Sequence, residues 1–208
     1  MTAKFIVIEG LEGAGKSTAI AVCQAYLQHK QVEFINVREP GGTPVAEALR
    51  HIVKQAHEEQ ITGETELLIM YAARSQLVAN VIKPAIDKGT WVLGDRHDLS
   101  SQAYQGGGRG IEQSKLSFFA DMVLKGLKPD LTIYLDIDPA VGLARAKGRG
   151  ELDRIEQEAL GFFERTRERY LALAEHDPSI QTVDANKAMP EVHAAITTVL
   201  DTFFESLK

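Results

Sequence analysis

The chain has 208 residues and carries 29 acidic against 23 basic side chains, so its net charge is −6, and its length is that of a single globular domain. With 44% hydrophobic and 25% charged residues it is not a disordered, collagen-like or coiled-coil protein, and no apolar run approaches the roughly 20 residues that span a membrane. The negative charge argues against broad binding to nucleic acid, which needs a basic surface.

The first segment and the only cysteine predict a cytoplasmic protein with no membrane partner. Residues 1–9 contain a single lysine and a short strand-like core, which is not the layout of a signal peptide. Cys23 has no second cysteine with which to form an intramolecular disulfide, in agreement with a reducing compartment.

Short runs of β-branched and aromatic residues recur along the chain. They lack the alternation of a one-sided sheet, so they predict buried parallel strands. The runs are Phe5–Ile8, Val32–Val37, Trp91–Leu93, Leu131–Ile137 and Ile180–Val183. Because helical stretches separate them, we expect an α/β fold with a doubly wound, parallel five-stranded sheet flanked by helices. Ligands of such sheets bind at the carboxyl ends of the strands.

Apolar residues between these runs recur at helical spacing, most clearly near the C-terminus. The two clearest series are Leu160, Phe163, Tyr170 and Ala174, and Val192, Ile196, Val199 and Phe203. Thr43-Pro44 and Asp138-Pro139 each place a capping side chain before a proline, so we expect a helix to begin at each. No repeat or linker interrupts the chain, which predicts one domain over residues 1–208.

The strongest motif follows the first predicted strand. Residues 10–17 match the pattern G-x-x-x-x-G-K-[ST] of a phosphate-binding P-loop, between a strand and a helix as that motif requires. Lys16 would reach the β- and γ-phosphates, and Ser17 would hold Mg²⁺. The alternative is a glycine-rich turn that only connects a strand to a helix. We therefore expect a P-loop NTPase and assign ATP binding to Gly10, Leu11, Glu12, Gly13, Ala14, Gly15, Lys16, Ser17 and Thr18.

Charged residues also follow the next two predicted strands. Asp95 follows the third strand, where it could serve Mg²⁺, and the adjacent Arg96 would direct its guanidinium into the same crevice. A surface ion pair is the alternative for these two residues. Arg38 follows the second strand, ahead of a Pro-Gly-Gly turn. We therefore expect Lys16, Arg38 and Arg96 to lie in one cleft.

Two later segments contain candidates for recognition of a base and a sugar. Met70 and Arg74 lie one turn apart in the predicted helix Glu64–Lys83, so an apolar side chain could flank a planar hydrogen-bond donor. A core methionine beside a solvated arginine is the alternative. The polar residues and single tyrosine between Ser100 and Arg109 suit contacts to a base and a sugar, and the glycine run among them predicts a loop.

The segment Arg145–Arg154 contains four basic and two acidic residues with two glycines. This composition predicts a small mobile lid, at about residues 145–155, that closes over phosphates. A solvated helix end is the alternative. Asp153 and Glu156 match a capping box for the helix that follows.

Taken together, these segments resemble the thymidylate kinases in their bacterial form. The likeness covers almost the whole chain, and it is carried by residues 8–17, 38–43, 71–74, 94–97, 103–109 and 150–156. Members of this family transfer a phosphoryl group from ATP to dTMP with Mg²⁺ and are usually homodimers. The resemblance therefore implies this activity, these two nucleotides, the metal and a homodimer.

The resemblance also implies residue roles. Lys16, Arg96 and Arg149 would be catalytic, and Ser17 and Asp95 would serve the metal. Arg38 and Arg96 would bind the acceptor phosphate, and Arg74 would hydrogen-bond thymine. The residues that it assigns to the acceptor are Glu12, Arg38, Met70, Arg74, Arg96, Ser101, Tyr104 and Gln105.

Two positions depart from patterns found in the family. Some members carry an arginine within the P-loop, where this chain has Ala14. It resembles the group that supplies this charge from the lid, so the role falls to Arg149, with Arg145 and Arg154 as helpers. Met70 stands where the family often has a phenylalanine that stacks on the base, which predicts weaker base discrimination.

Three other activities compete with this expectation. A deoxynucleoside kinase would use an acid such as Glu39 as a base, but the tryptophan that those enzymes place shortly after it is absent, because Trp91 is the only one. Another nucleoside monophosphate kinase is the second alternative. A guanine-nucleotide switch is the third, although the nearest match to its N-K-x-D motif, Asn186–Met189, lacks the acid. The six histidines are scattered and predict no zinc site.

Overall fold

The structure, a computed structural model, describes residues 2–148 and 150–208. It contains a five-stranded sheet in the order β2-β3-β1-β4-β5, in which every pairing is parallel. The strands are β1 (Phe5–Gly10), β2 (Phe34–Arg38), β3 (Trp91–Asp95), β4 (Leu131–Asp136) and β5 (Ile180–Asp184). The predicted α/β fold with a doubly wound parallel sheet is thus confirmed.

One strand begins later than its sequence predicts. The apolar run starts at Val32, but β2 starts at Phe34. Gln31 has a left-handed φ of 56°, and the Val32 N–H donates to the carbonyl of Leu27. These two residues therefore end the preceding helix instead of opening the strand.

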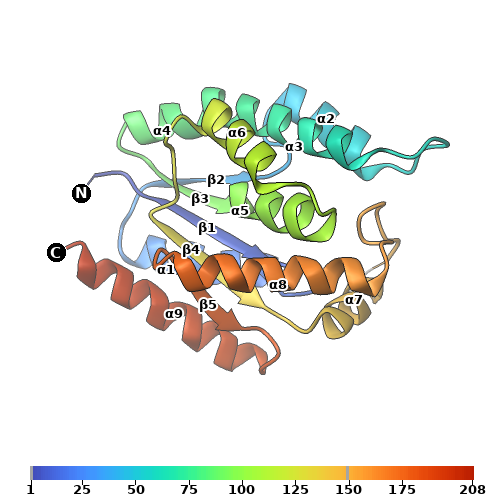
Figure 1. The fold of residues 1–208 in the computed structure, drawn as a ribbon. Helices are drawn as coiled ribbons and strands as arrows, with labels where there is room; N and C mark the ends of the chain where they lie inside the picture. Colours follow the sequence, from blue (N-terminus) through green and yellow to red (C-terminus); the bar gives the residue numbers. More distant parts are fainter. Residues whose placement is uncertain (1, 149) are drawn as a thin grey trace.

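Helices connect the strands and cover both faces of the sheet (Figure 1). The helices are α1 (Lys16–His29), α2 (Pro44–Lys54), α3 (Gly63–Leu77), α4 (Lys83–Asp87), α5 (Asp98–Ser101), α6 (Gln113–Leu124), α7 (Pro139–Lys147), α8 (Leu160–His176) and α9 (Met189–Ser206). Two π-helical turns, η1 (Val78–Ile82) and η2 (Gln102–Gly108), continue α3 and α5.

Successive side chains of the central strand β1 point to opposite faces of the sheet, so their neighbours show which helices cover each face. Ile6 and Ile8 pack in a cluster with residues of α1 and α9. Phe5 and Val7 point the other way and pack with residues of α3, η1, α4 and α6. On that second face, Tyr134 of β4 stacks on Tyr170 of α8 at 4.6 Å between ring centroids. The strand tips lie at one end of the molecule, and both termini lie near the other end (Figure 1).

The predicted helix starts hold at two positions and fail at a third. The Thr43 side chain accepts a hydrogen bond from the N–H of Ala46, and the Asp138 side chain accepts from the N–H groups of Ala140 and Val141. Asp153 and Glu156 do exchange the hydrogen bonds of a capping box. These bonds close only a turn, because α8 begins at Leu160.

The glycine run at residues 106–108, predicted as a loop, is helical instead. A Cβ atom on Gly108 would lie 2.5 Å from the ring of Phe162, and one on Gly107 would lie 2.6 Å from the Cβ of Arg169. These glycines therefore allow η2 to pack closely against α8. Within the described part of the chain, no helix is long and apolar enough to cross a membrane.

Candidate active site

A cavity of about 360 Å³ opens at the carboxyl ends of β1, β2 and β3. It brings together the side chains of Lys16, Arg38 and Arg96, as the order of the strands predicts. The sequence-predicted residues that line it are Glu12, Gly13, Gly15, Lys16, Ser17, Thr18, Arg38, Met70, Arg74, Asp95, Arg96, Ser101, Tyr104, Gln105 and Arg145. Leu11 and Ala14 are buried, and neither they nor Gly10 and Arg154 line the cavity. Arg149 lies outside the described residues.

The P-loop is shaped by glycines in the left-handed region. Gly13 has a φ of 73°, and a Cβ atom there would lie 2.1 Å from the carbonyl oxygen of Gly142, so the loop packs tightly on α7. Lys16 starts α1, and its Nζ donates to the carbonyl oxygens of Gly10 (2.9 Å) and Leu11 (2.8 Å). Burial and the nearby Arg96 charge lower the pKa of Lys16 to about 8.

Arg96 is fixed by its backbone and by its side chain. Its φ of 68° is left-handed, which is unfavourable for a residue other than glycine, and its N–H donates to the carbonyl of Ile8. The guanidinium donates to Glu12 (2.8 Å) and to Tyr104 (3.2 Å), and Tyr104 donates in turn to Glu12 (2.6 Å). Burial acts to raise the pKa of Glu12, but Arg96 and Lys16 outweigh it, so the pKa lies below its ordinary value.

A buried acid that the sequence analysis did not single out supports Arg96 from beneath. Glu9 accepts hydrogen bonds from the N–H of His97 (2.8 Å), the hydroxyl of Ser100 (2.6 Å) and the hydroxyl of Tyr170 (2.8 Å). Ser100 also accepts from the Arg96 guanidinium. Burial raises the pKa of the Glu9 carboxyl in spite of the opposing Arg96 charge. Glu9 directly follows the apolar run Phe5–Ile8, and nothing in the sequence distinguishes it from other acids at a strand end.

Arg74 is buried, with only 2% of its surface exposed, so it is not the solvated arginine of the alternative interpretation. Its Nε donates to Glu39 (2.7 Å), its Nη2 donates to Ser101 (3.0 Å), and its Nη1 is 3.3 Å from Asp98. Burial acts to lower the pKa of Arg74, but Glu39 and Asp98 outweigh it and raise the pKa. Met70 is partly buried and lines the cavity one turn away.

Glu39 also joins Arg74 to His97, whose Nδ1 lies 2.7 Å from the other carboxylate oxygen. Both carboxylate oxygens of Glu39 are thus engaged by buried partners. Burial acts to raise the pKa of Glu39, but the Arg74 charge and the hydrogen bonds from His97 and Arg74 outweigh it and lower the pKa below its ordinary value. Each oxygen thus already contacts a buried partner, which disfavours Glu39 as the base that a deoxynucleoside kinase would require.

Arg50 and Lys54 are cations of the cavity wall that the sequence analysis missed. The predicted Arg38 is partly exposed and pairs with Glu47 at 2.7 Å. Arg50 lies beside it, and both guanidiniums donate to the carbonyl of Pro40. Arg50 and Lys54 both line the cavity. Their spacing of four residues, in the helix after the second strand, was the signal available in the sequence.

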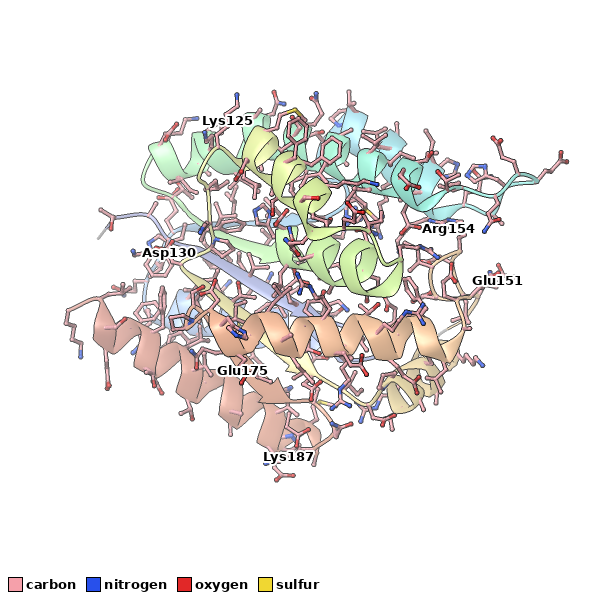
Figure 2. The ribbon with its side chains drawn as sticks, in the orientation of Figure 1. Lys125, Asp130, Glu151, Arg154, Glu175 and Lys187 are labelled. Atoms are coloured by element: carbon pink, nitrogen blue, oxygen red, sulfur yellow. The ribbon has the colours of Figure 1, made fainter. Side chains whose placement is uncertain are left out.

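The segment after α7 is held against α2. The Arg154 guanidinium donates to the carbonyl of Val53 and to the buried carboxylate of Glu66, and Asp153 pairs with Lys54. Figure 2 shows Arg154 between this segment and the α2–α3 side of the molecule. Arg145 reaches the opposite side, where it donates to the carbonyl of Ala185. Of the two predicted helpers, Arg145 lines the cavity and Arg154 does not.

Comparisons with known proteins identify the family of this chain. A sequence model of the thymidylate kinase family matches residues 8–196. Over all 208 residues the chain is 71% identical to the full length of a protein named thymidylate kinase from Pseudoalteromonas translucida. It is 61% identical over 193 residues to a thymidylate kinase from Colwellia psychrerythraea, with 92% of this chain and 91% of that protein covered. It is 58% identical over 200 residues to one from Alteromonas mediterranea, with 96% and 90% covered. The chain therefore belongs to the thymidylate kinase family.

Proposed function

We propose that the chain transfers the γ-phosphoryl group of ATP to dTMP, which yields ADP and dTDP. The observation that carries this proposal is the convergence of Lys16, Arg38 and Arg96 on one cavity in a protein of net charge −6. A phosphate monoester has a second pKa of about 6, so the acceptor is already an anion and needs no strong base. The reaction then depends on positioning two anions and neutralising their charge.

The donor side of the cavity fits ATP with Mg²⁺. The P-loop N–H groups and Lys16 would hold the phosphates of ATP. Asp95 Oδ1 is buried and has no hydrogen-bond partner among the described residues, and Ser17 lines the same cavity. Oxygen donors of this kind suit Mg²⁺, which in nucleotide sites takes one or two protein ligands and completes its shell with phosphate and water. When bound, the metal would neutralise charge on the transferred group.

The acceptor side would hold dTMP through its phosphate and its base. Arg38 and Arg96 would bind the phosphate, and Arg50 is placed to assist because it shares the Pro40 carbonyl with Arg38. Glu12 would lie beside the sugar and the phosphate. Arg74, Met70, Ser101, Tyr104 and Gln105 would surround the thymine and the deoxyribose.

The transferring phosphoryl group still requires a cation between donor and acceptor. We assign this role to Arg149, with Arg145 as a helper, on the family resemblance and on the arginine density of residues 145–154. Arg154 is the less suitable helper, because Glu66 and Val53 engage it. Closure of this segment as a lid would exclude water and limit hydrolysis of ATP.

We also propose a cytoplasmic homodimer, and an apolar surface supports the assembly. Large hydrophobic side chains of α2, α3 and α6 are exposed: Val45, Ile52, Leu68, Phe118 and Met122. An exposed group of this kind is typical of a subunit interface. Light scattering after size-exclusion chromatography should give twice the chain mass for the wild type and the chain mass for Phe118→Glu. A monomeric wild type would remove this part of the proposal.

One assay tests the activity. ADP release would be measured with ATP, Mg²⁺ and, in turn, dTMP, dUMP, dCMP, dAMP or thymidine. We expect a clear preference for dTMP and no phosphorylation of thymidine. Equal rates over the monophosphates would remove the roles of Arg74, Ser101 and Gln105, and activity on thymidine would favour a deoxynucleoside kinase.

A further inference from the structure

Glu66 is a fully buried acid of α3 that does not line the cavity. Its Oε1 accepts hydrogen bonds from Gln105 Nε2 (2.8 Å) and from Arg109 Nε (3.1 Å). Its Oε2 accepts from Arg109 Nη2 (2.8 Å) and from Arg154. Through these bonds Glu66 connects the nucleoside wall of the cavity to the segment that carries Arg154.

The charge state of Glu66 fixes the orientation of the Gln105 amide. Burial acts to raise the pKa of the Glu66 carboxyl, but hydrogen bonds from Arg109 and Arg154 outweigh it and the pKa lies below its ordinary value. A carboxylate can only accept hydrogen bonds, so the amide of Gln105 must turn its NH₂ group toward it. The carbonyl oxygen of Gln105 then points elsewhere.

That carbonyl oxygen is available to a ligand. Within the described part of the chain, Gln105 Oε1 has no hydrogen-bond partner, yet it is not among the buried unpaired atoms, which are Asp95 Oδ1, His97 Nε2 and His193 Nε2. Gln105 is only 1% exposed and lines the cavity, so the small accessible part of its carbonyl oxygen borders that cavity. On the same wall Arg74 can only donate. Gln105 and Arg74 thus supply this wall with a hydrogen-bond acceptor and a donor.

We propose that Glu66 is a positioning residue that sets base selectivity, because it holds the Gln105 amide with its acceptor oxygen toward the base. An acceptor beside a donor matches an imide edge, in which an N–H adjoins a carbonyl, as in thymine and uracil. Cytosine presents the reverse pattern at the same positions. This inference rests on the proposed function, since it concerns which monophosphate the acceptor site takes.

The test compares kcat/KM for dTMP, dUMP and dCMP in Glu66→Gln and Glu66→Asp. A glutamine can donate or accept, so the Gln105 amide can turn over, and we expect the preference for dTMP over dCMP to fall by about tenfold or more in Glu66→Gln. Glu66→Asp keeps an acceptor that cannot donate and should keep the preference. The ratio of dTMP to dUMP should not change in either variant, because the two bases share the imide edge. These ratios are independent of the fraction of enzyme that is folded.

A double-mutant cycle separates positioning from a structural role. Gln105→Leu removes the acceptor and should lower the preference for dTMP over dCMP, and addition of Glu66→Gln should lower it no further. Arg109→Leu is the matched control, because it removes the two hydrogen bonds that Arg109 donates to Glu66 but keeps the one between Gln105 and Glu66. This variant should lower the stability of the protein but keep the preference for dTMP over dCMP.

Three results would overturn the inference: an unchanged ratio in Gln105→Leu, additive losses in the cycle, or equal losses in Glu66→Gln and Arg109→Leu. Should Glu66→Gln yield no folded protein, the preference for dTMP over dCMP in Gln105→Leu and Arg109→Leu still tests the inference. A wild type that does not phosphorylate dTMP would instead refute the proposed function.

Discussion

Glu39→Gln tests whether the buried ion pair beneath the acceptor site stabilises the protein. The side chains of Glu39 and Arg74 are 4% and 3% exposed, and the side chain of His97, on the other oxygen of Glu39, is 2% exposed. Glutamine keeps the shape but removes the charge that compensates Arg74. It also places an NH₂ group against His97 Nδ1, so either two donors face each other or the ring proton moves to Nε2, where the described residues offer no partner.

The size of the expected stability loss in Glu39→Gln follows from the burial of the ion pair. Removal of one partner of a buried ion pair costs about 3–5 kcal/mol. Since Asp98 remains 3.3 Å from Arg74, we expect a loss of about 3 kcal/mol in the free energy of unfolding, at the lower end of that range. For a chain of this length that loss corresponds to a decrease of about 6–12 °C in Tm.

The matched control is Glu47→Gln. Glu47 and Arg38 make a hydrogen bond of the same 2.7 Å length, but their side chains are 45% and 40% exposed. Exposed pairs of this kind contribute about 1 kcal/mol or less. Thermal melting of both variants, followed by circular dichroism, measures the contrast. Equal decreases in Tm would refute the argument that burial, rather than distance, sets the strength of the Glu39 pair.

Three other predictions concern pH and single charges. The folded pKa of Glu39 lies below the unfolded value of 4.5, so its stabilisation is complete above that value. The stability gap between wild type and Glu39→Gln should therefore narrow as pH falls below 4.5; a gap that widens in acid would contradict this sign. Because the pKa of Lys16 is about 8, the affinity for ATP in an equilibrium titration should fall by several-fold to about tenfold from pH 7 to pH 9. The affinity for dTMP, held by arginines that do not titrate, should stay constant, and a flat ATP profile would contradict the lowered pKa. Arg149→Ala should lower kcat by about 10³-fold or more with little change in dTMP affinity, and an unaltered rate would place the assisting charge elsewhere.

The architecture and the phosphate side of the site could be predicted because their signals are local. The P-loop pattern fixes the turn between β1 and α1, and continuous apolar runs predict buried parallel strands. Once the strands are parallel, topology brings their carboxyl ends together. Arg38 and Arg96 therefore fall beside Lys16 although they are far apart in the chain.

The buried acids could not be predicted, because their partners come from distant segments. Glu9 joins β1 to α8 through Tyr170, and Glu66 joins α3 to Arg154, 88 residues later. In the sequence each is one glutamate among many. The glycine run at residues 106–108 misled for a related reason, since its conformation depends on close packing against Phe162 and Arg169 and not on the local preference of glycine.

These acids explain how an anionic protein builds a cationic cleft. A guanidinium inside a protein loses its hydration and is stable only beside an opposite charge. Glu12 pairs with Arg96, and Glu39 pairs with Arg74. These pairs leave some hydrogen-bond donors of the arginines unused. A guanidinium has five N–H donors, and the described contacts of Arg96 use three of them. The remaining donors can bind a phosphate while the acids keep the side chain in place. The acidic partners therefore orient the cations in advance, and this orientation supplies the electrostatic preorganisation on which phosphoryl transfer depends.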